Sequence, residues 1–409
     1  MNGPRTLAAV LLLCLAPIGG VVVADTPPDS AAPHPQTDSA DRAMMIFDAG
    51  NGSEYLAPSP DRIDRVENRT VGLDVAAAVE ADAAGLESAY AVGTLERRYG
   101  DAATDAEREA VVEDGIERLA ERADALHAAD RTAIRQFNRG AIDEHELLRQ
   151  LTALHRAGGV TAEGLEWLET AASELGMDGA AERAASSRIT LLPTGGPVRA
   201  ELAAAASDGG SLNVHVETAG DGLVLAAIDR TGDTYLREAH DPEARDRQTA
   251  DQYSGSPLLA LERIEELYPW VTENDLGVSA SPIGPTFDRV YRFTIPHPHG
   301  ELETYLDSGS ESVAVEFQRN DPAALPTDRT ETTADDHRLV VDATRGGGPV
   351  GISVVDAATG DPVDARIELN GVTVGSTGGD RLWTVAPRGS VSIDATHADG
   401  TVSTELSLP

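Results

Sequence analysis

The clearest hydrophobic pattern in the chain lies between residues 104 and 126, where apolar positions recur at alternating spacings of four and three. Thr104 followed by Glu107 has the form of a capping box, in which each side chain accepts a backbone N–H at the start of a helix. The apolar positions after it fall on one stripe of a helix, and they are Val112, Ile116, Leu119, Ala123 and Leu126. A stripe of this kind must be buried, so the pattern predicts a helical bundle over residues 71–205.

Shorter signals of the same kind predict the other helices of this bundle. Asp130 is expected to cap a short helix, and the Gly158-Gly159 pair is expected to end another, before a last helix that starts at Thr161. The first helix should end at Gly100, and its predicted buried stripe is Val75, Val79, Ala83, Leu86 and Tyr90. Short connections between these segments favour antiparallel neighbours.

From Ser211 onward the period of the apolar residues changes to two, which is typical of β-strands. Gly220-Asp221-Gly222 and Thr231-Gly232-Asp233 supply turns between such strands, while Ser256-Pro257 is a helix start. Two later alternating runs predict further strands, with a short helical turn over residues 302–306 between them. The pattern therefore predicts an α+β domain with an antiparallel sheet over residues 210–319, followed by a Pro- and Thr-containing linker over 320–337.

The last part of the chain, residues 338–409, consists of short alternating runs separated by turn signals, which is the pattern of a β-sandwich. Trp383 follows Leu382 directly, so the two side chains must point to opposite faces of a strand. Trp383 therefore either anchors the sandwich core or lies exposed on the other face. The whole pattern predicts a multidomain α+β protein with a helical bundle, a central α+β domain and a C-terminal sandwich.

Two stretches of this sandwich carry a family resemblance. The run VVDAATGDPVDA at 354–365 resembles the first hairpin of carboxypeptidase-regulatory-like (transthyretin-like) domains, and WTVAPRGSV at 383–391 is similar to their later edge. Ser390 and Val391 stand where that edge has an aromatic residue. The resemblance implies a surface module without catalytic residues. The domain order, with YLAP at 55–58 and IPHPHG at 295–300, also resembles a family of exported haloarchaeal proteins, which implies a location outside the cell.

Composition points to the same setting. The chain of 409 residues has 69 Asp and Glu against 32 Lys and Arg, a formal net charge of −37, and contains no lysine at all. At about 1 M salt the Debye length is about 3 Å, so repulsion between carboxylates is screened while their charges keep the surface hydrated. This balance is typical of proteins from extreme halophiles. It also argues against a nucleic-acid partner, because nothing in the chain neutralises a row of phosphates.

The N-terminus has the form of a signal peptide over residues 1–24. Arg5 precedes an apolar run, and small residues at Val22 and Ala24 place cleavage between Ala24 and Asp25. A retained anchor and lipidation at Cys14, the only cysteine, are the alternatives. Residues 25–70 are expected to be a solvated tether with a short N-terminal segment. It carries two N-glycosylation sequons, which begin at Asn51 and Asn68.

The motifs that carry catalysis are mostly excluded. Without lysine there is no P-loop lysine or Schiff base, and without a mature cysteine there is no thiol nucleophile. His145-Glu146 begins like a zinc-protease helix, but Arg149 occupies the place of the second histidine. The acids of the predicted turns match no calcium-binding loop, and they are Asp221, Asp229 and Asp233.

His297 and His299 are the weak candidates for a metal site. One residue apart in an extended segment, they would project to the same side, and Glu301 and Glu303 could add oxygen ligands. The alternative is that both histidines serve turn geometry or aromatic packing.

These observations favour a non-enzymatic exported halophilic protein that binds or organises other components at the cell surface or outside the cell. No cofactor, nucleic acid or membrane span of the mature chain is expected, and the oligomeric state is left open. The alternative is a secreted hydrolase whose carboxylates or histidines act in the central α+β domain.

Overall fold

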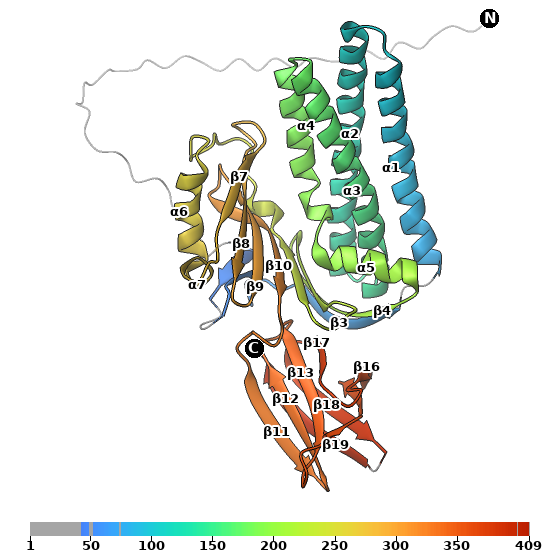
Figure 1. The fold of residues 1–409 in the computed structure, drawn as a ribbon, viewed down its shortest axis with the longest axis vertical. Helices are drawn as coiled ribbons and strands as arrows, with labels where there is room; N and C mark the ends of the chain where they lie inside the picture. The colour runs from blue at the N-terminus through green and yellow to red at the C-terminus, as the bar shows by residue number, and fades with distance from the viewer. Residues whose placement is uncertain (1–41, 49–51, 73–74, 399, 409) are drawn as a thin grey trace, which may run out of the picture. The chain divides into compact units, whose positions relative to one another are not determined.

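The computed structural model describes residues 42–48, 52–72, 75–398 and 400–408, together with the side chains in these ranges except those of 75–78 and 80. It contains a helical region, a central antiparallel sheet and a C-terminal pair of sheets (Figure 1). The predicted fold class is confirmed. None of the helices in the described ranges combines the length and the apolar character needed to cross a bilayer.

The helical region consists of long helices that pack along one another. Its members are α1 (Val75–Asp101), α2 (Asp105–Asn138), α3 (Glu144–Glu174), α4 (Asp178–Thr190), the short 3-10 helix η2 (Leu192–Thr194) and α5 (Pro197–Asp208). The capping box predicted for α2 is present, with Glu107 N–H donating to Thr104 Oγ1 and Thr104 N–H donating to the Glu107 carboxylate. The predicted stripe from Val112 to Leu126 is buried in the core of this region.

Three predicted helix boundaries are wrong. Asp130 lies inside the continuous helix α2, where it is buried and accepts a hydrogen bond from Arg199 at 2.6 Å. Gly158, Gly159 and Thr161 all lie inside α3, so neither the predicted helix end nor the predicted helix start is found there. An added Cβ at Gly158 would lie 2.2 Å from Thr194 Oγ1, so this glycine permits the close approach of η2 and does not end the helix.

The stripe predicted to bury the first helix is also wrong. Leu86 and Tyr90 of α1 are 71% and 73% exposed. The opposite face of α1 packs along α3 through small residues, including the buried Ala81 and Ser88. Small side chains let two helix backbones approach closely, and this packing outweighed burial of the larger apolar residues.

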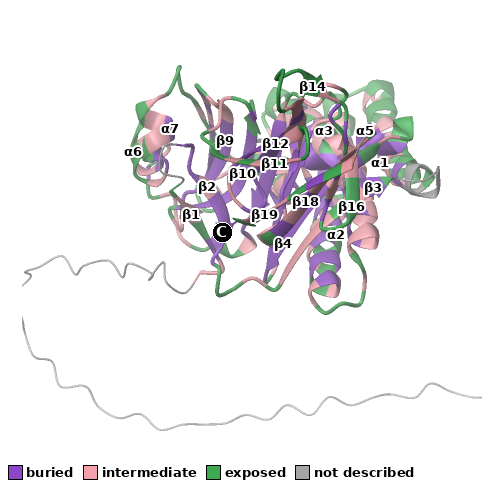
Figure 2. Ribbon diagram, turned by 90° about the horizontal axis from the view of Figure 1, so that it is seen from below, coloured by how far each residue is buried: buried purple, intermediate pink, exposed green. Residues whose placement is uncertain are grey.

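The central sheet has eight antiparallel strands in the order β3-β4-β5-β6-β10-β9-β8-β7. Their bounds are β3 (Arg65–Gly72), β4 (Ser211–Ala219), β5 (Gly222–Ile228), β6 (Tyr235–His240), β7 (Ser279–Ile283), β8 (Val290–His297), β9 (Gly300–Asp307) and β10 (Ser312–Asn320). Its middle strands are almost entirely buried (Figure 2). The predicted helical turn over 302–306 is wrong, because Leu302 and Leu306 lie in β9; their spacing of four suits a helix and a strand equally.

Both faces of this sheet are covered. Helices α2, α3 and α5 pack on one face at β3 to β6. The other face is covered by α6 (Pro257–Leu267), α7 (Pro269–Glu273) and a hairpin of β1 (Met44–Phe47) and β2 (Tyr55–Pro58). The predicted tether over 25–70 thus contains β1, β2 and most of β3, which joins the sheet by pairing with β4.

The C-terminal domain is a sandwich of two sheets around one apolar core. One sheet has β11 (Asp328–Ala334), β12 (His337–Ala343), β13 (Pro349–Asp356), β14 (Pro362–Val363) and β17 (Leu382–Val385); the other has β15 (Arg366–Leu369), β16 (Val372–Ser376), β18 (Gly389–His397) and β19 (Gly400–Leu408). The structure differs from the predicted linker over 320–337, because β11 pairs along β12. Trp383 neither anchors this core nor points freely into solvent, since it packs with residues of β5 and β6.

Candidate functional site

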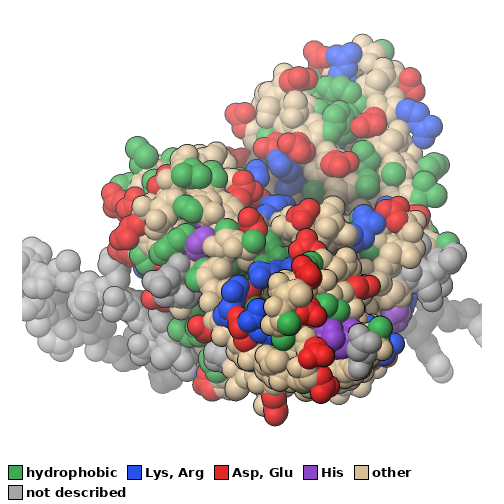
Figure 3. Space-filling view, turned by 60° about the horizontal axis from the view of Figure 1, so that its bottom comes forward, with side chains coloured by type: hydrophobic (Ala, Val, Ile, Leu, Met, Phe, Trp, Pro, Cys, Tyr) green, Lys and Arg blue, Asp and Glu red, His purple; other side chains and the backbone are tan. Residues whose placement is uncertain are grey.

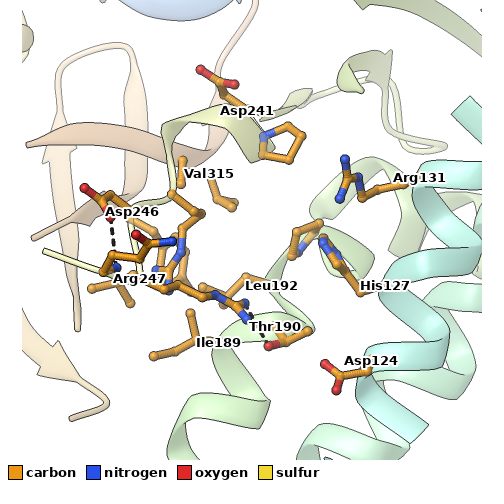
Figure 4. Close-up of a pocket in the computed structure, with 17 residues that line it drawn as sticks. Asp124, His127, Arg131, Ile189, Thr190, Leu192, Asp241, Asp246, Arg247 and Val315 are labelled. Carbon is orange, nitrogen blue, oxygen red and sulfur yellow. Dashed lines mark hydrogen bonds between the residues drawn. The ribbon is translucent and has the colours of Figure 1, made fainter. Parts of the chain in front are cut away.

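A cleft of about 420 Å³ is lined by residues of both the helical region and the central sheet (Figure 4). One wall is α2, with Asp124, His127 and Arg131, and the opposite wall follows β6 through the 3-10 helix η3 (Pro242–Ala244). Apolar side chains complete the lining, and they include Ile189, Leu192, Val290, Tyr305 and Val315. The volume is within the range of about 300–1,000 Å³ that is usual for small-molecule sites.

Asp241 is the most buried acid of this cleft, with 3% of its surface exposed. It follows β6 and caps η3, because its carboxylate accepts the backbone N–H of Glu243 at 3.1 Å. Burial raises the pKa of the Asp241 carboxyl to about 6, since a charged carboxylate loses hydration there. This carboxyl therefore titrates closer to neutrality than an ordinary aspartate.

Two arginines on the same wall are held by carboxylates. Arg245 forms an ion pair with Asp288 and lies 3.3 Å from Asp307. Arg247 donates to Thr190 Oγ1 at 3.0 Å and lies 3.4 Å from Asp288. Each guanidinium is thus fixed in direction by the protein, and its charge is largely offset before any ligand arrives.

The α2 wall is fixed in a similar way. Arg131 Nε donates to Asp221 Oδ2 at 2.8 Å, which joins α2 to the turn between β4 and β5. His127 Nδ1 is buried and has no hydrogen-bond partner among the described residues. Burial lowers the pKa of His127, so its imidazole is neutral over a wider pH range.

Three guanidiniums of the cleft, those of Arg131, Arg245 and Arg247, are each anchored by the protein beside an apolar surface, which suits a small ligand with polar and apolar parts. An activated nucleophile needs a hydrogen bond to an adjacent base. Within the described ranges, no hydroxyl of the cleft makes such a bond with His127. The cleft was not predicted, because its residues come from segments more than a hundred positions apart.

The histidines singled out from the sequence lie elsewhere, at the hairpin between β8 and β9. His299 stacks on Trp270 with ring centroids 4.3 Å apart, and His297 meets the same ring edge-on at 5.7 Å. Burial lowers the pKa of His297 to about 4, with a smaller effect from His299. The structure thus places both in an aromatic cluster. Among the described residues, no group of three or more His, Cys, Asp or Glu is arranged to hold a metal ion.

The predicted signal-cleavage and glycosylation residues lie only partly within the described ranges. Ala24, Asp25 and Asn51 lie outside the described residues. Asn68 lies on β3, and its Nδ2 donates to Val385 O of the C-terminal domain at 3.1 Å. A glycan on this nitrogen would have to displace that domain.

The acids predicted in the turns form hydrogen bonds with neighbouring protein groups. Asp221 binds Arg131 and Arg135, and Asp229 accepts the backbone N–H groups of Gly232 and Asp233. These bonds stabilise the turns that connect the sheet strands.

The sequence patterns did not predict a group of buried charges between the helices and the sheet. Arg199 of α5 is fully buried between Asp130 of α2 and Glu238 of β6, and Glu238 also accepts the backbone N–H groups of Val198 and Arg199. This carboxylate therefore caps α5 from a strand. The only signal in the sequence is a pair of adjacent charges, Arg237-Glu238, inside a strand with apolar neighbours.

The three parts of the fold define a class of archaeal multidomain protein with a C-terminal immunoglobulin-like sheet domain. Residues 1–211, more than half of the 409, match the family described as a domain of unknown function, DUF7096, so the chain belongs to that family. Residues 214–326 match a family of unknown function, DUF7094, and 328–404 match an archaeal fibronectin-III type-like domain. No curated protein and no solved structure gives a significant match.

Proposed function

We propose that this protein is a non-enzymatic, exported protein of a halophilic archaeon that binds or organises components at the cell surface or outside the cell. The observation that carries the proposal is the cleft, in which Arg131, Arg245 and Arg247 are each held by structural partners. Fixed charges of this kind recognise a ligand, whereas catalysis requires a group free to exchange a proton or form a bond.

Sequence features support the export and halophilic parts of the proposal. The N-terminal segment has the form of a signal peptide cleaved after Ala24, and the chain has a net charge of −37 without lysine. Acidic and basic side chains are interspersed on the face shown in Figure 3, so a continuous basic surface for nucleic acid is not seen there. The likeness of 354–365 to carboxypeptidase-regulatory-like hairpins supports a surface module and stays a proposal.

The test compares ligand capture by two charge-reversal variants in molar salt. Arg247→Glu changes the cleft, and Arg97→Glu changes an exposed arginine that hydrogen-bonds only within α1. The tagged full-length protein is expressed in its native cells and crosslinked, and the envelope fraction is analysed. We expect the same specific components with the wild type and Arg97→Glu, and their loss with Arg247→Glu. Recovery of the protein from the cytoplasm, or equal capture by both variants, contradicts the proposal.

A secreted hydrolase is the second candidate, and Asp241 is the observation that favours it. A carboxyl with a pKa of about 6 in a cleft beside a neutral histidine could act as a general acid or base. Hydrolysis of ester, glycoside or peptide probes that disappears in Asp241→Asn would establish this candidate over the first.

A further inference from the structure

A buried histidine of β4, His215, lies where the C-terminal sandwich contacts the central sheet, and only 1% of its surface is exposed. Its Nδ1 lies 2.9 Å from Asn68 Oδ1 of the neighbouring strand β3, and its Nε2 lies 3.0 Å from Glu217 Oε1 of its own strand. The sandwich closes over the imidazole at Gly347, where an added Cβ would lie 2.7 Å from His215 Nε2. Each ring nitrogen therefore faces an oxygen within a buried contact.

The sandwich fixes the orientation of the Asn68 amide. Asn68 Nδ2 donates to Val385 O of β17 at 3.1 Å. A backbone carbonyl can only accept, so the amide must turn its nitrogen to Val385 and its oxygen to His215. The amide oxygen also can only accept, so Nδ1 of His215 must carry a proton while the sandwich is docked.

The other ring nitrogen faces a carboxylate. Burial raises the pKa of Glu217, but the contact with His215 and the charge of Arg388 lower it, and the net result is a lowered pKa. Glu217 is therefore ionised at neutral pH and can only accept. A neutral imidazole has one N–H, so a ring protonated at Nδ1 would turn the lone pair of Nε2 to Glu217 Oε1 at 3.0 Å. Only an imidazolium supplies a donor to both oxygens.

The surrounding charges act in both directions. Arg237 is offset by Glu316 at 2.8 Å, and Arg388 lies 3.0 Å from Glu217. The charge of Arg345, which stacks on an aromatic ring, opposes a second proton on His215, whereas the carboxylate of Glu217 favours it. The requirement for two donors decides between these effects. The charged or titratable groups that line the small void beside His215 are Tyr55, Glu217, Arg237, Arg345 and Arg388.

We propose that docking of the sandwich takes up one proton on His215, so that pH controls whether the C-terminal domain stays docked. When the sandwich leaves, Val385 no longer fixes Asn68, and the amide can turn to donate to Nδ1 of a neutral imidazole whose Nε2–H faces Glu217. The undocked form thus accommodates a neutral imidazole, and the docked form does not. Docking is favoured at low pH and weakens as the pH rises, because histidine changes its charge between about pH 5 and 8.

The experiment follows docking and the protonation of His215 in the full-length protein in molar salt. Spin labels on Asp233→Cys and Asp361→Cys, exposed positions of the sheet and the sandwich, report the distance between the domains, and Cys14→Ser removes the native thiol. Nitrogen NMR of the histidine rings, with His215→Gln to identify the signal, reports whether both nitrogens carry protons.

We expect the ratio of docked to undocked protein to fall by up to about tenfold per pH unit once His215 loses its proton, because one proton is linked to docking. Docked protein that keeps the imidazolium up to about pH 8 also agrees with the proposal. A docked fraction that grows with pH, or docked protein whose His215 is neutral, overturns it.

Three variants separate proton linkage from simple packing. Gly347→Val inserts a side chain against the His215 ring, so it should undock the sandwich and leave His215 neutral at a pH where the wild type is docked. Glu217→Gln introduces an amide that can donate to a neutral imidazole, so docking should lose its pH dependence. His145→Gln changes a histidine of α3 and should leave the profile unchanged. Wild-type pH dependence in Glu217→Gln contradicts the proposal, and none of these results bears on the role proposed for the cleft.

Discussion

Two adjacent glycines of α3 should respond to alanine with opposite signs. Gly158 and Gly159 both lie in the interior of the helix, where alanine stabilises relative to glycine by roughly 0.5–1 kcal/mol. Gly159 is exposed, and an added Cβ there meets nothing within 4 Å, so Gly159→Ala should show the whole gain. The helix propensity term is the same at Gly158, so any difference between the two variants reports the local contact.

At Gly158 an added Cβ would clash with the side chain of Thr194. The new Cβ would lie 2.2 Å from Thr194 Oγ1 and 3.0 Å from Thr194 Cβ. Thr194 cannot move away freely, because it is 1% exposed and its hydroxyl donates to Leu191 O at 2.8 Å. Overpacking of this kind costs about 1–3 kcal/mol, so Gly158→Ala should be less stable than Gly159→Ala by about that amount or more.

Thermal unfolding followed by helical circular dichroism at constant molar salt measures the difference. For a domain of this size, about 1–3 kcal/mol corresponds to a gap of roughly 3–10 °C between the two melting temperatures. Thr194→Ala removes the closest atom and should recover part of the loss when combined with Gly158→Ala. Equal melting temperatures for the two glycine variants would refute the reasoning, because they would show that η2 can move away from the added Cβ without a loss of stability.

Three further predictions concern charge and domain boundaries. Arg199→Met should destabilise the protein by about 3–5 kcal/mol at neutral pH, because it leaves two buried carboxylates without a cation. Burial raises the pKa of Glu238, but His240 at 3.7 Å and Arg199 together lower it, and the net result is a lowered pKa. The wild type therefore loses the stabilisation from this ion pair as the pH falls, so the difference in unfolding free energy between wild type and Arg199→Met should shrink. A difference that stays constant with pH in denaturant titrations would contradict this. A fragment of residues 328–409 should melt cooperatively and at a higher temperature than 338–409, since only the longer one keeps β11 paired with β12; equal melts would show that β11 adds nothing. The melting temperature of the whole protein should fall when salt is lowered from molar to about 0.1 M, and a flat profile would count against a halophilic origin.

Local signals in the sequence determined the types and order of most of the elements. The capping box at Thr104, the cap at Ser256 and the alternation of Leu212, Val214 and Val216 are each complete within a few residues, and each appears in the structure as predicted. Such features depend on neighbours in the chain, so the fold class could be predicted from them. The composition determined the surface charge in the same direct way.

The tertiary structure alone decided which faces are buried and where the cavities lie. The α1 stripe is exposed because small residues on the other face fit α3 more closely, and Gly158 serves a contact with Thr194 that lies 36 positions away (194 − 158). The buried pair of Arg199 and Glu238 likewise depends on strands and helices that meet only after folding. The cleft and the contact around His215 have this origin: their polar groups come from distant segments, and local periodicity contains no information about partners at such distances.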